Sequence, residues 1–300
     1  MPEPLIRSRP GPASAPRSSA ATPAAALVTH RAAVLGMPIE HSLSPVLHMA
    51  AYAELGLSGW DYGRYAVDEA GLPGFVAGLG PEWVGLSLTM PLKRVALDVA
   101  DEVTPETAAI GAANTLVRRD AGWLATNTDV VGIEQSLRAV GVTAVESAVV
   151  VGAGGTAQAA LAALRGLGET TPTVLVRDPA RAGALRDTAE RLGVTPRILG
   201  GFPGTPLPPA DVVISTVPAG AADVLADIAW APATVLLDVI YAPWPTAPAA
   251  AAAAAGCRVV GGLEVLLHQA VGQVELMTGR LGPTEAMGAA LAAAAGDRRP

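Results

Sequence analysis

A short glycine-rich turn constrains the fold of this 300-residue chain more than any other feature of its sequence. Residues 152–157 read Gly-Ala-Gly-Gly-Thr-Ala and fit the pattern G-x-G-x-x-G/A, and a continuous apolar strand is expected just before them, over residues 147–151. A helix is expected over residues 157–167 and another strand over residues 173–176. A dinucleotide-binding unit requires this order, because the glycines let the backbone approach a pyrophosphate and the helix N-terminus supplies amide donors. The alternative, a glycine turn that arises by chance, would not need the flanking elements.

The rest of the hydrophobic pattern alternates strands and helices. Further strands are expected over residues 31–35, 84–89, 114–118, 122–125, 212–215, 235–238 and 258–260. Further helices are expected over residues 91–100, 130–140, 262–279 and 284–295. The fold class predicted is α/β with two domains, an N-terminal α/β substrate-binding domain and a Rossmann-type, doubly wound dinucleotide-binding domain, with C-terminal helices returning to the first domain.

Domain boundaries follow from the same pattern. Residues 1–29 are rich in Pro, Ala and Ser without apolar periodicity and predict a disordered extension. We expect a substrate-binding catalytic domain over residues 30–128, a nucleotide-binding domain over residues 129–265, and C-terminal helices over residues 266–300.

Composition excludes several classes of protein. The net charge of −7 argues against a nucleic-acid binder, which needs a basic face, and no apolar run is long enough for a membrane span. The single cysteine, Cys257, excludes an internal disulfide and favours a reducing cytoplasm. The four histidines show no ligand spacing with carboxylates, so no metal is predicted. The expected partners are small molecules, in a monomer or homodimer.

Lys93 is the only lysine among 20 basic residues. In a chain that uses arginine elsewhere, a remaining lysine marks a position where guanidinium does not suffice, because only an ammonium readily gives up a proton. It follows the strand expected over residues 84–89, at the carboxyl edge of the sheet where sites of open α/β proteins gather. The alternative is a chance lysine on a solvated helix.

Other polar residues stand at the starts of predicted helices and strands. Ser44 precedes Pro45 and can cap a helix, and together with Ser42 it can equally cradle a carboxylate. Asn114 and Asn127 are the only asparagines, and an amide that donates and accepts suits a vicinal diol. Asp129 taken alone favours a helix N-cap over a catalytic role.

Taken together, seven ordered motifs resemble the shikimate dehydrogenase family. They span residues 31 to about 295 and comprise residues 36–45, 89–93, 111–115, 127–129, 152–155, 238–241 and 262–269. The resemblance implies that Lys93 and Asp129 are the catalytic pair. It implies a shikimate site lined by Ser42, Ser44, Thr89, Asn114, Tyr241 and Gln269.

The resemblance implies reduction of 3-dehydroshikimate to shikimate, with hydride from the nicotinamide of the cofactor. The substrate oxygen then needs a proton donor, and a neighbouring carboxylate favours the charged ammonium of Lys93. We therefore expect Lys93 to donate the proton and to stabilise developing alkoxide, in a site tuned for reduction, with Asp129 as a route for the proton to solvent. Ser87 stands where the family often has Asn, and a serine there can still donate.

The cofactor clamp differs from the usual family pattern. After the second strand of the nucleotide domain the chain has Arg177 and Arg181, which can pair with a 2′-phosphate, but also Asp178, which suits the free 2′-hydroxyl of NAD. The balance favours NADP, with NAD possible. The cofactor-binding residues expected are Gly152, Ala153, Gly154, Gly155, Thr156, Arg177, Asp178, Arg181, Thr216 and Gly262. The alternative function is a quinate or aminoshikimate dehydrogenase that uses NAD, and a non-catalytic sensor on the same fold is a further alternative.

Overall fold

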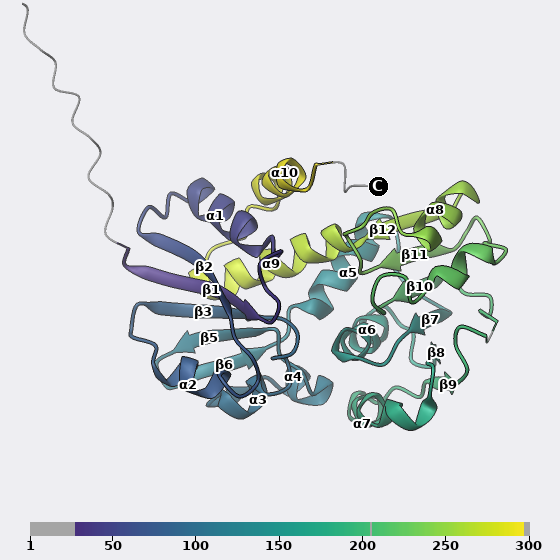
Figure 1. Ribbon diagram of the computed structural model, residues 1–300, viewed down its shortest axis with the longest axis horizontal. Coiled ribbons are helices and arrows are strands. Elements are labelled where there is room, and N and C mark those ends of the chain that lie inside the picture. Colours follow the sequence, from purple (N-terminus) through teal and green to yellow (C-terminus); the bar gives the residue numbers. More distant parts are fainter. Residues whose placement is uncertain (1–27, 205, 297–300) are drawn as a thin grey trace, which may run out of the picture.

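The computed structural model describes residues 28–204 and 206–296, which form two six-stranded sheets side by side (Figure 1). The first sheet has the order β2-β1-β3-β5-β6-β4. Its strands are β1 (His30–Gly36), β2 (Trp60–Ala66), β3 (Trp83–Leu88), β4 (Glu102–Val103), β5 (Thr115–Arg119) and β6 (Gly122–Thr126). β1 is parallel to β2 and β3, whereas β5 is antiparallel to β3 and β6. Of the predicted extension over residues 1–29, residues 1–27 lie outside the described part of the chain.

The second sheet is parallel throughout, in the order β12-β11-β10-β7-β8-β9. Its strands are β7 (Ala148–Val151), β8 (Thr173–Leu175), β9 (Arg197–Leu199), β10 (Val212–Ser215), β11 (Val235–Asp238) and β12 (Arg258–Gly261). β7 is apolar throughout, and β10 and β11 are apolar up to their last residue, because both faces of a parallel sheet are covered. The strand order reverses between β7 and β10, the switch point where doubly wound sheets bind ligands. The predicted fold class is confirmed.

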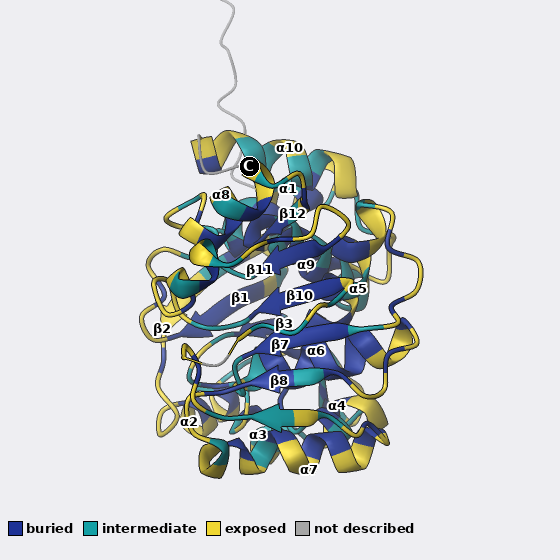
Figure 2. Ribbon diagram, turned by 90° about the vertical axis from the view of Figure 1, so that its right-hand side faces the viewer, coloured by how far each residue is buried: buried dark blue, intermediate teal, exposed yellow. Residues whose placement is uncertain are grey.

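Helices cover both faces of the second sheet. One face packs on α5 (Asp129–Ala139), α6 (Gly155–Gly166) and α7 (Gly183–Leu192), the other on α8 (Ala247–Ala254) and the 3₁₀ helix η2 (Asp223–Asp227). Val150 points into the first of these cores, whereas Val149 and Val151 point into the second. The strands accordingly lie buried inside a shell of exposed helix surfaces (Figure 2).

The first sheet is covered in a similar way, and the C-terminal helices contribute to it. One face packs on α2 (Leu72–Ala77) and α3 (Ala96–Val99), the other on α1 (Ser44–Glu54) and α9 (Gly262–Thr278). The short α4 (Pro105–Ile110) follows β4. α9 begins at β12 and runs back across the first sheet, and α10 (Thr284–Ala295) packs on α1 (Figure 1). The predicted return of the C-terminal helices is confirmed, while the boundaries at residues 128 and 265 stay a proposal.

Two local predictions are wrong. The helix expected over residues 91–100 is a turn followed by the single helical turn of α3, because the Lys93 carbonyl accepts the backbone N–H of Ala113 at 2.7 Å and not a helical partner. Ser44 does not cap α1, since the helix begins at Ser44 itself, with Leu43 at the N-cap and no side-chain capping bond.

No helix in the described ranges is long and apolar enough to cross a membrane. Within residues 28–204 and 206–296, no group of three or more His, Cys, Asp or Glu side chains could hold a metal ion.

Candidate active site

The strand pattern of the first sheet brings the predicted polar residues to one edge. β3 ends where β5 begins, because the two are antiparallel and Ser87 pairs with Thr115. β6 ends at the same edge, since Thr115 also pairs with Thr126. The segments that follow β3 and β6, and the residue before β5, therefore meet at this edge and face the second sheet.

Lys93 and Asp129 form an ion pair at this edge. The Lys93 ammonium lies 2.5 Å from Oδ2 of Asp129, and the two side chains are only 21% and 11% exposed. Asp129 is the first residue of α5 but makes no capping bond, so its carboxylate is directed at the lysine and the N-cap alternative is wrong. A partly buried pair of this kind is screened less by solvent than a surface pair.

Asn114 holds the other oxygen of the carboxylate. Its Nδ2 donates to Oδ1 of Asp129 at 2.8 Å, while its Oδ1 accepts the backbone N–H of Thr128 at 2.8 Å. Asn127 has a different task, because its amide donates to the Ala112 carbonyl and accepts the Asp129 backbone N–H. Of the two asparagines, only Asn114 contacts a side chain of the ion pair.

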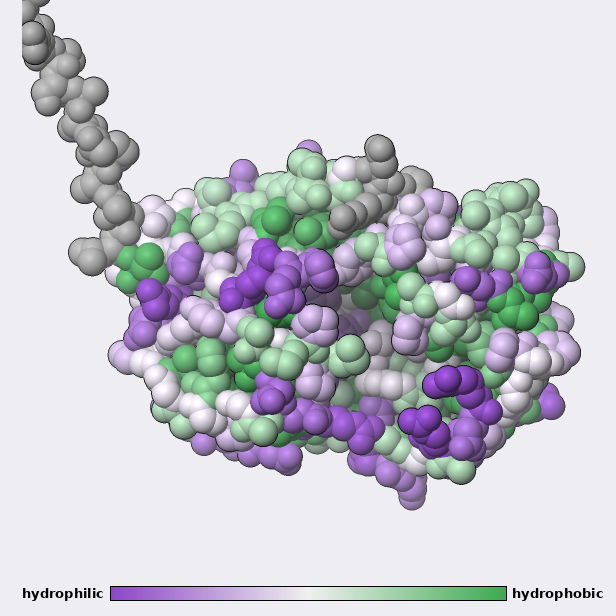
Figure 3. Space-filling view, viewed as in Figure 1, coloured by the Kyte–Doolittle hydropathy of each residue, from purple (hydrophilic) through white to green (hydrophobic). Residues whose placement is uncertain are grey.

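A cavity of about 310 Å³, here called the junction cavity, lies beside the ion pair, between the two lobes of the protein that are built on the first and the second sheet. Its volume is at the lower end for small-molecule sites, which suits a ligand of one ring. Every predicted catalytic and substrate-binding residue lines it: Ser42, Ser44, Thr89, Lys93, Asn114, Asp129, Tyr241 and Gln269. Figure 3 shows the surface hollowed where the two lobes meet.

Sequence reasoning missed most of a buried layer behind this cavity. Ser87, which the sequence had singled out, and Gln273, which it had not, line the cavity wall. His48 and Tyr62 pack behind them with stacked rings 3.9 Å apart. Burial lowers the pKa of His48 to about 3 and raises that of Tyr62 above its ordinary value. A signal for Gln273 existed, because it follows Gln269 by four residues and so lies on the same face of α9.

A second cavity, here called the glycine-turn cavity, measures about 460 Å³ and lies at the switch point of the second sheet. It is lined by the predicted residues Gly152, Ala153, Gly154, Arg177, Asp178, Arg181 and Thr216, and also by Leu175, Val176, Phe202, Val217, Pro218 and Ala221. Gly152 has φ +115°, and a Cβ there would come within 2.5 Å of the Thr216 hydroxyl, so only glycine fits. A Cβ on Gly154 would meet nothing within 4 Å, which leaves the start of α6 open to a ligand.

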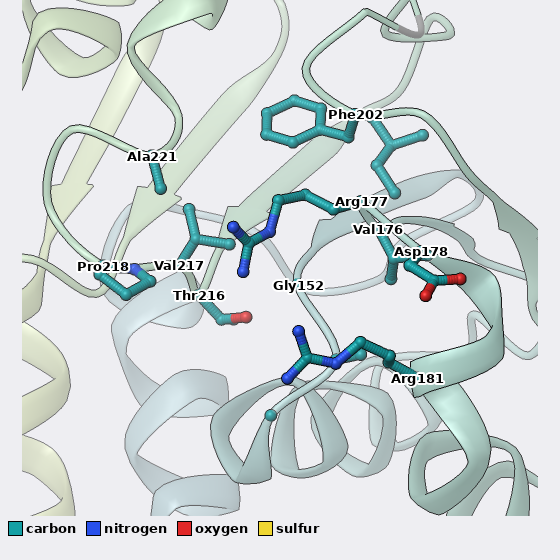
Figure 4. Close-up of a pocket in the computed structure, with 13 residues that line it drawn as sticks. Gly152, Val176, Arg177, Asp178, Arg181, Phe202, Thr216, Val217, Pro218 and Ala221 are labelled. Carbon is teal, nitrogen blue, oxygen red and sulfur yellow. The ribbon is translucent and has the colours of Figure 1, made fainter.

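The two arginines and the aspartate of this cavity point in different directions. The guanidinium groups of Arg177 and Arg181 point into the cavity, whereas the Asp178 carboxylate points away from it (Figure 4). Asp178 accepts the backbone N–H of Ala180 at 2.9 Å and caps the 3₁₀ helix η1 (Pro179–Ala182). The carboxylate that raised the question of cofactor preference is thus occupied by a local cap.

Three residues predicted to bind cofactor lie where the two cavities approach each other. Thr156 and Gly262 line the junction cavity and not the glycine-turn cavity. A Cβ on Gly155 would lie 3.9 Å from Cδ of Lys93, so the glycine turn abuts the lysine side chain. A Cβ on Gly262 would come within 2.1 Å of the Val239 carbonyl, which gives this glycine a packing role as well.

A doubly wound parallel sheet with a glycine turn, beside a cavity lined by a lysine–aspartate pair, is the arrangement of a two-domain α/β dehydrogenase. Comparison with known proteins narrows this class. Residues 34–116 match the family described as "Shikimate dehydrogenase substrate binding domain", and residues 262–292 match "Shikimate 5'-dehydrogenase C-terminal domain". A relative from Thermosynechococcus vestitus named "Shikimate dehydrogenase (NADP(+))" is 36% identical, over 89% of this chain and 96% of that protein.

Solved structures agree. The shikimate dehydrogenase of Mycobacterium tuberculosis is 48% identical with a TM-score of 0.80, covering 88% of this chain and 99% of that one. The Thermus thermophilus enzyme, solved in complex with NADP(H) and shikimate, is 32% identical with a TM-score of 0.76, over 88% of this chain and 99% of the other. The chain belongs to the shikimate dehydrogenase family.

Proposed function

We propose that this chain catalyses the NADP-dependent reduction of 3-dehydroshikimate to shikimate, a step toward chorismate and the aromatic amino acids. The observation that carries the proposal is the Lys93–Asp129 pair at the wall of the junction cavity, beside the glycine turn. The relatives support it, because one is named shikimate dehydrogenase (NADP(+)) and another was solved with NADP(H) and shikimate.

The glycine-turn cavity fits a nicotinamide dinucleotide. The open position at Gly154 and the amides at the start of α6 suit a pyrophosphate, and Gly152 keeps the turn tight. When bound, NADPH supplies the hydride that reduces the carbonyl carbon. Because Gly155 abuts Lys93, a nicotinamide that enters the junction cavity would lie next to the lysine.

Lys93 and Asp129 then divide the proton chemistry. The Lys93 ammonium donates its proton to the carbonyl oxygen as hydride reaches the carbon, and its charge stabilises the developing alkoxide. The Asp129 carboxylate orients the ammonium, and Asn114 holds the other oxygen of that carboxylate. This arrangement favours donation over abstraction, so we propose a site suited to reduction.

The remaining predicted residues bind the substrate. Ser42, Ser44 and Tyr241 suit its carboxylate, while Asn114 and Gln269 suit its hydroxyls, since an amide can both donate and accept. Arg177 and Arg181 suit the 2′-phosphate of NADP, and the direction of Asp178 removes the main argument for NAD. We further propose a cytoplasmic enzyme without nucleic-acid partners, as a monomer or homodimer.

The test is the initial rate of NADPH oxidation at 340 nm with 3-dehydroshikimate, run beside quinate with NAD. The proposal expects turnover of 3-dehydroshikimate with NADPH and a much lower kcat/KM in the quinate assay. Turnover of quinate with NAD alone would support the alternative function. Binding of shikimate without any turnover would instead support a sensor.

A further inference from the structure

The buried layer behind the junction cavity is one connected set of hydrogen bonds centred on Gln273. Gln273 is 1% exposed and lies on α9 between Ser87 of β3 and Thr115 of β5. Its Oε1 accepts the Ser87 hydroxyl at 2.7 Å and Nε2 of His48 at 3.3 Å, and its Nε2 donates to the Thr115 hydroxyl at 2.9 Å. All four groups are buried, so each bond forms away from competing water.

The direction of the Gln273 amide is fixed by a backbone carbonyl. Its Nε2 also donates to the Asn114 carbonyl at 3.3 Å, and a carbonyl can only accept. Oε1 must therefore face Ser87 and His48, and His48 must carry its proton on Nε2. One amide thus presents an acceptor toward one side of the cavity and a donor toward the other.

The acceptor side leads to the residues proposed for the substrate carboxylate. Ser87 gives its only proton to Gln273, so it accepts the hydrogen bond from the Tyr62 hydroxyl at 2.6 Å. Ser44, which lines the junction cavity, lies against the Tyr62 hydroxyl. The stacked ring of His48 holds Tyr62 from behind.

The donor side leads to the catalytic pair. Thr115 accepts from Gln273 and donates to Oδ1 of Asn114 at 2.8 Å. This bond, together with the Thr128 backbone N–H, turns the Nδ2 group of Asn114 toward Asp129. A continuous series of oriented hydrogen bonds therefore joins Tyr62, which lies against Ser44, to Asp129, and the Gln273 amide stands in its middle.

We propose that Gln273 is a positioning residue that sets the direction of the hydrogen bonds on both sides of the substrate cavity, and so couples the carboxylate-binding serine to the catalytic pair. The inference rests on the proposed function, because it concerns the same cavity. It assigns Gln273 no contact with the reacting atoms. Its expected signature is a change in shikimate affinity and in kcat that a purely structural substitution on the same helix does not give.

The experiment compares Gln273→Met with Val274→Ala. Methionine keeps the size of glutamine without its polar atoms, and Val274 is a buried neighbour on α9 that faces the α1–α10 core. Shikimate affinity is measured by titration calorimetry without cofactor, and kcat with NADPH and 3-dehydroshikimate. Gln273→Met should weaken shikimate binding and lower kcat each by about fivefold or more, the worth of one or two neutral hydrogen bonds. Val274→Ala should lower Tm with both values within twofold of the parent.

Gln273→Glu supplies the conservative rescue. A protonated glutamic acid can accept from Ser87 and donate to Thr115, as the amide does, whereas the ionised form can only accept. The variant should therefore bind shikimate close to the parent at pH 5.5 and lose affinity, relative to the parent, as the carboxyl ionises at higher pH.

Two results would overturn the inference. One is a Gln273→Met effect no larger than that of Val274→Ala. The other is a Gln273→Glu variant that binds no better than Gln273→Met at any pH between 5.5 and 9. Failure of the proposed function looks different, because the parent protein itself would then not turn over 3-dehydroshikimate with NADPH.

Discussion

Cofactor preference should depend on Arg177 and Arg181 and not on Asp178. Both guanidinium groups point into the glycine-turn cavity, where a 2′-phosphate can accept from them (Figure 4). A hydrogen bond to a charged group contributes about 1.5–3 kcal/mol, which corresponds to a change of roughly 10- to 150-fold. Arg177→Ala and Arg181→Ala should therefore each lower kcat/KM for NADPH by roughly 10- to 150-fold. NADH has no 2′-phosphate, so the kcat/KM of each variant for NADH should stay within about threefold of the parent value.

The assay is the initial rate at 340 nm with saturating 3-dehydroshikimate and varied NADPH or NADH. Asp178→Ala is the matched control, because its carboxylate accepts from Ala180 and should matter for the η1 cap alone. That variant should lose about 1 kcal/mol of stability with little change in cofactor preference. Equal losses with NADPH and NADH in the arginine variants would refute the reasoning. So would a large gain in NADPH use in Asp178→Ala.

The other two predictions concern stability. Gly262→Ala should lower the free energy of unfolding by about 2–4 kcal/mol, measured with urea, because its Cβ would come within 2.1 Å of the Val239 carbonyl; an unchanged midpoint would contradict the packing. Burial lowers the pKa of His48 to about 3, whereas the pKa of the same side chain in the unfolded protein is near 6.5. Between these pH values only the unfolded state binds the proton, so the free energy of unfolding falls as the pH drops below 6.5. The loss should reach about 2 kcal/mol at pH 5, and His48→Phe should flatten that slope. An equal slope in the variant would show that other groups cause it.

The sequence predicted the nucleotide-binding half well because its signals are local. The strand before the glycine turn is continuously apolar, and the turn itself is contiguous in the chain. β2 escaped prediction because it is an edge strand in which only Tyr62 is buried, so its sequence has no apolar period. The helix expected after Pro91 failed for a tertiary reason, since the Ala113 backbone takes the Lys93 carbonyl.

The site could be predicted only as a set of residues, not as an arrangement. Lys93 stood out by composition and Asp129 by its motif, but their contact depends on the antiparallel pairing of β3 and β5. The direction of Asp178 depends on the cap at Ala180, which a list of charges does not reveal. Gln273 has no charge and lies outside the seven motifs, so its spacing from Gln269 was its one signal, and its place between two strands became visible only with the fold.

The most direct test of the central claim is the kcat of Lys93→Met and Lys93→Arg in the reduction of 3-dehydroshikimate by NADPH, with shikimate affinity measured beside it. If the ammonium donates the proton, Lys93→Met lowers kcat by about 10² or more, the usual contribution of a positioned acid, and leaves affinity nearly intact. Lys93→Arg should also fail, because a guanidinium keeps the charge but does not give up a proton. A kcat close to the parent value in Lys93→Met would contradict the account, and full activity in Lys93→Arg would reduce the role of Lys93 to its charge.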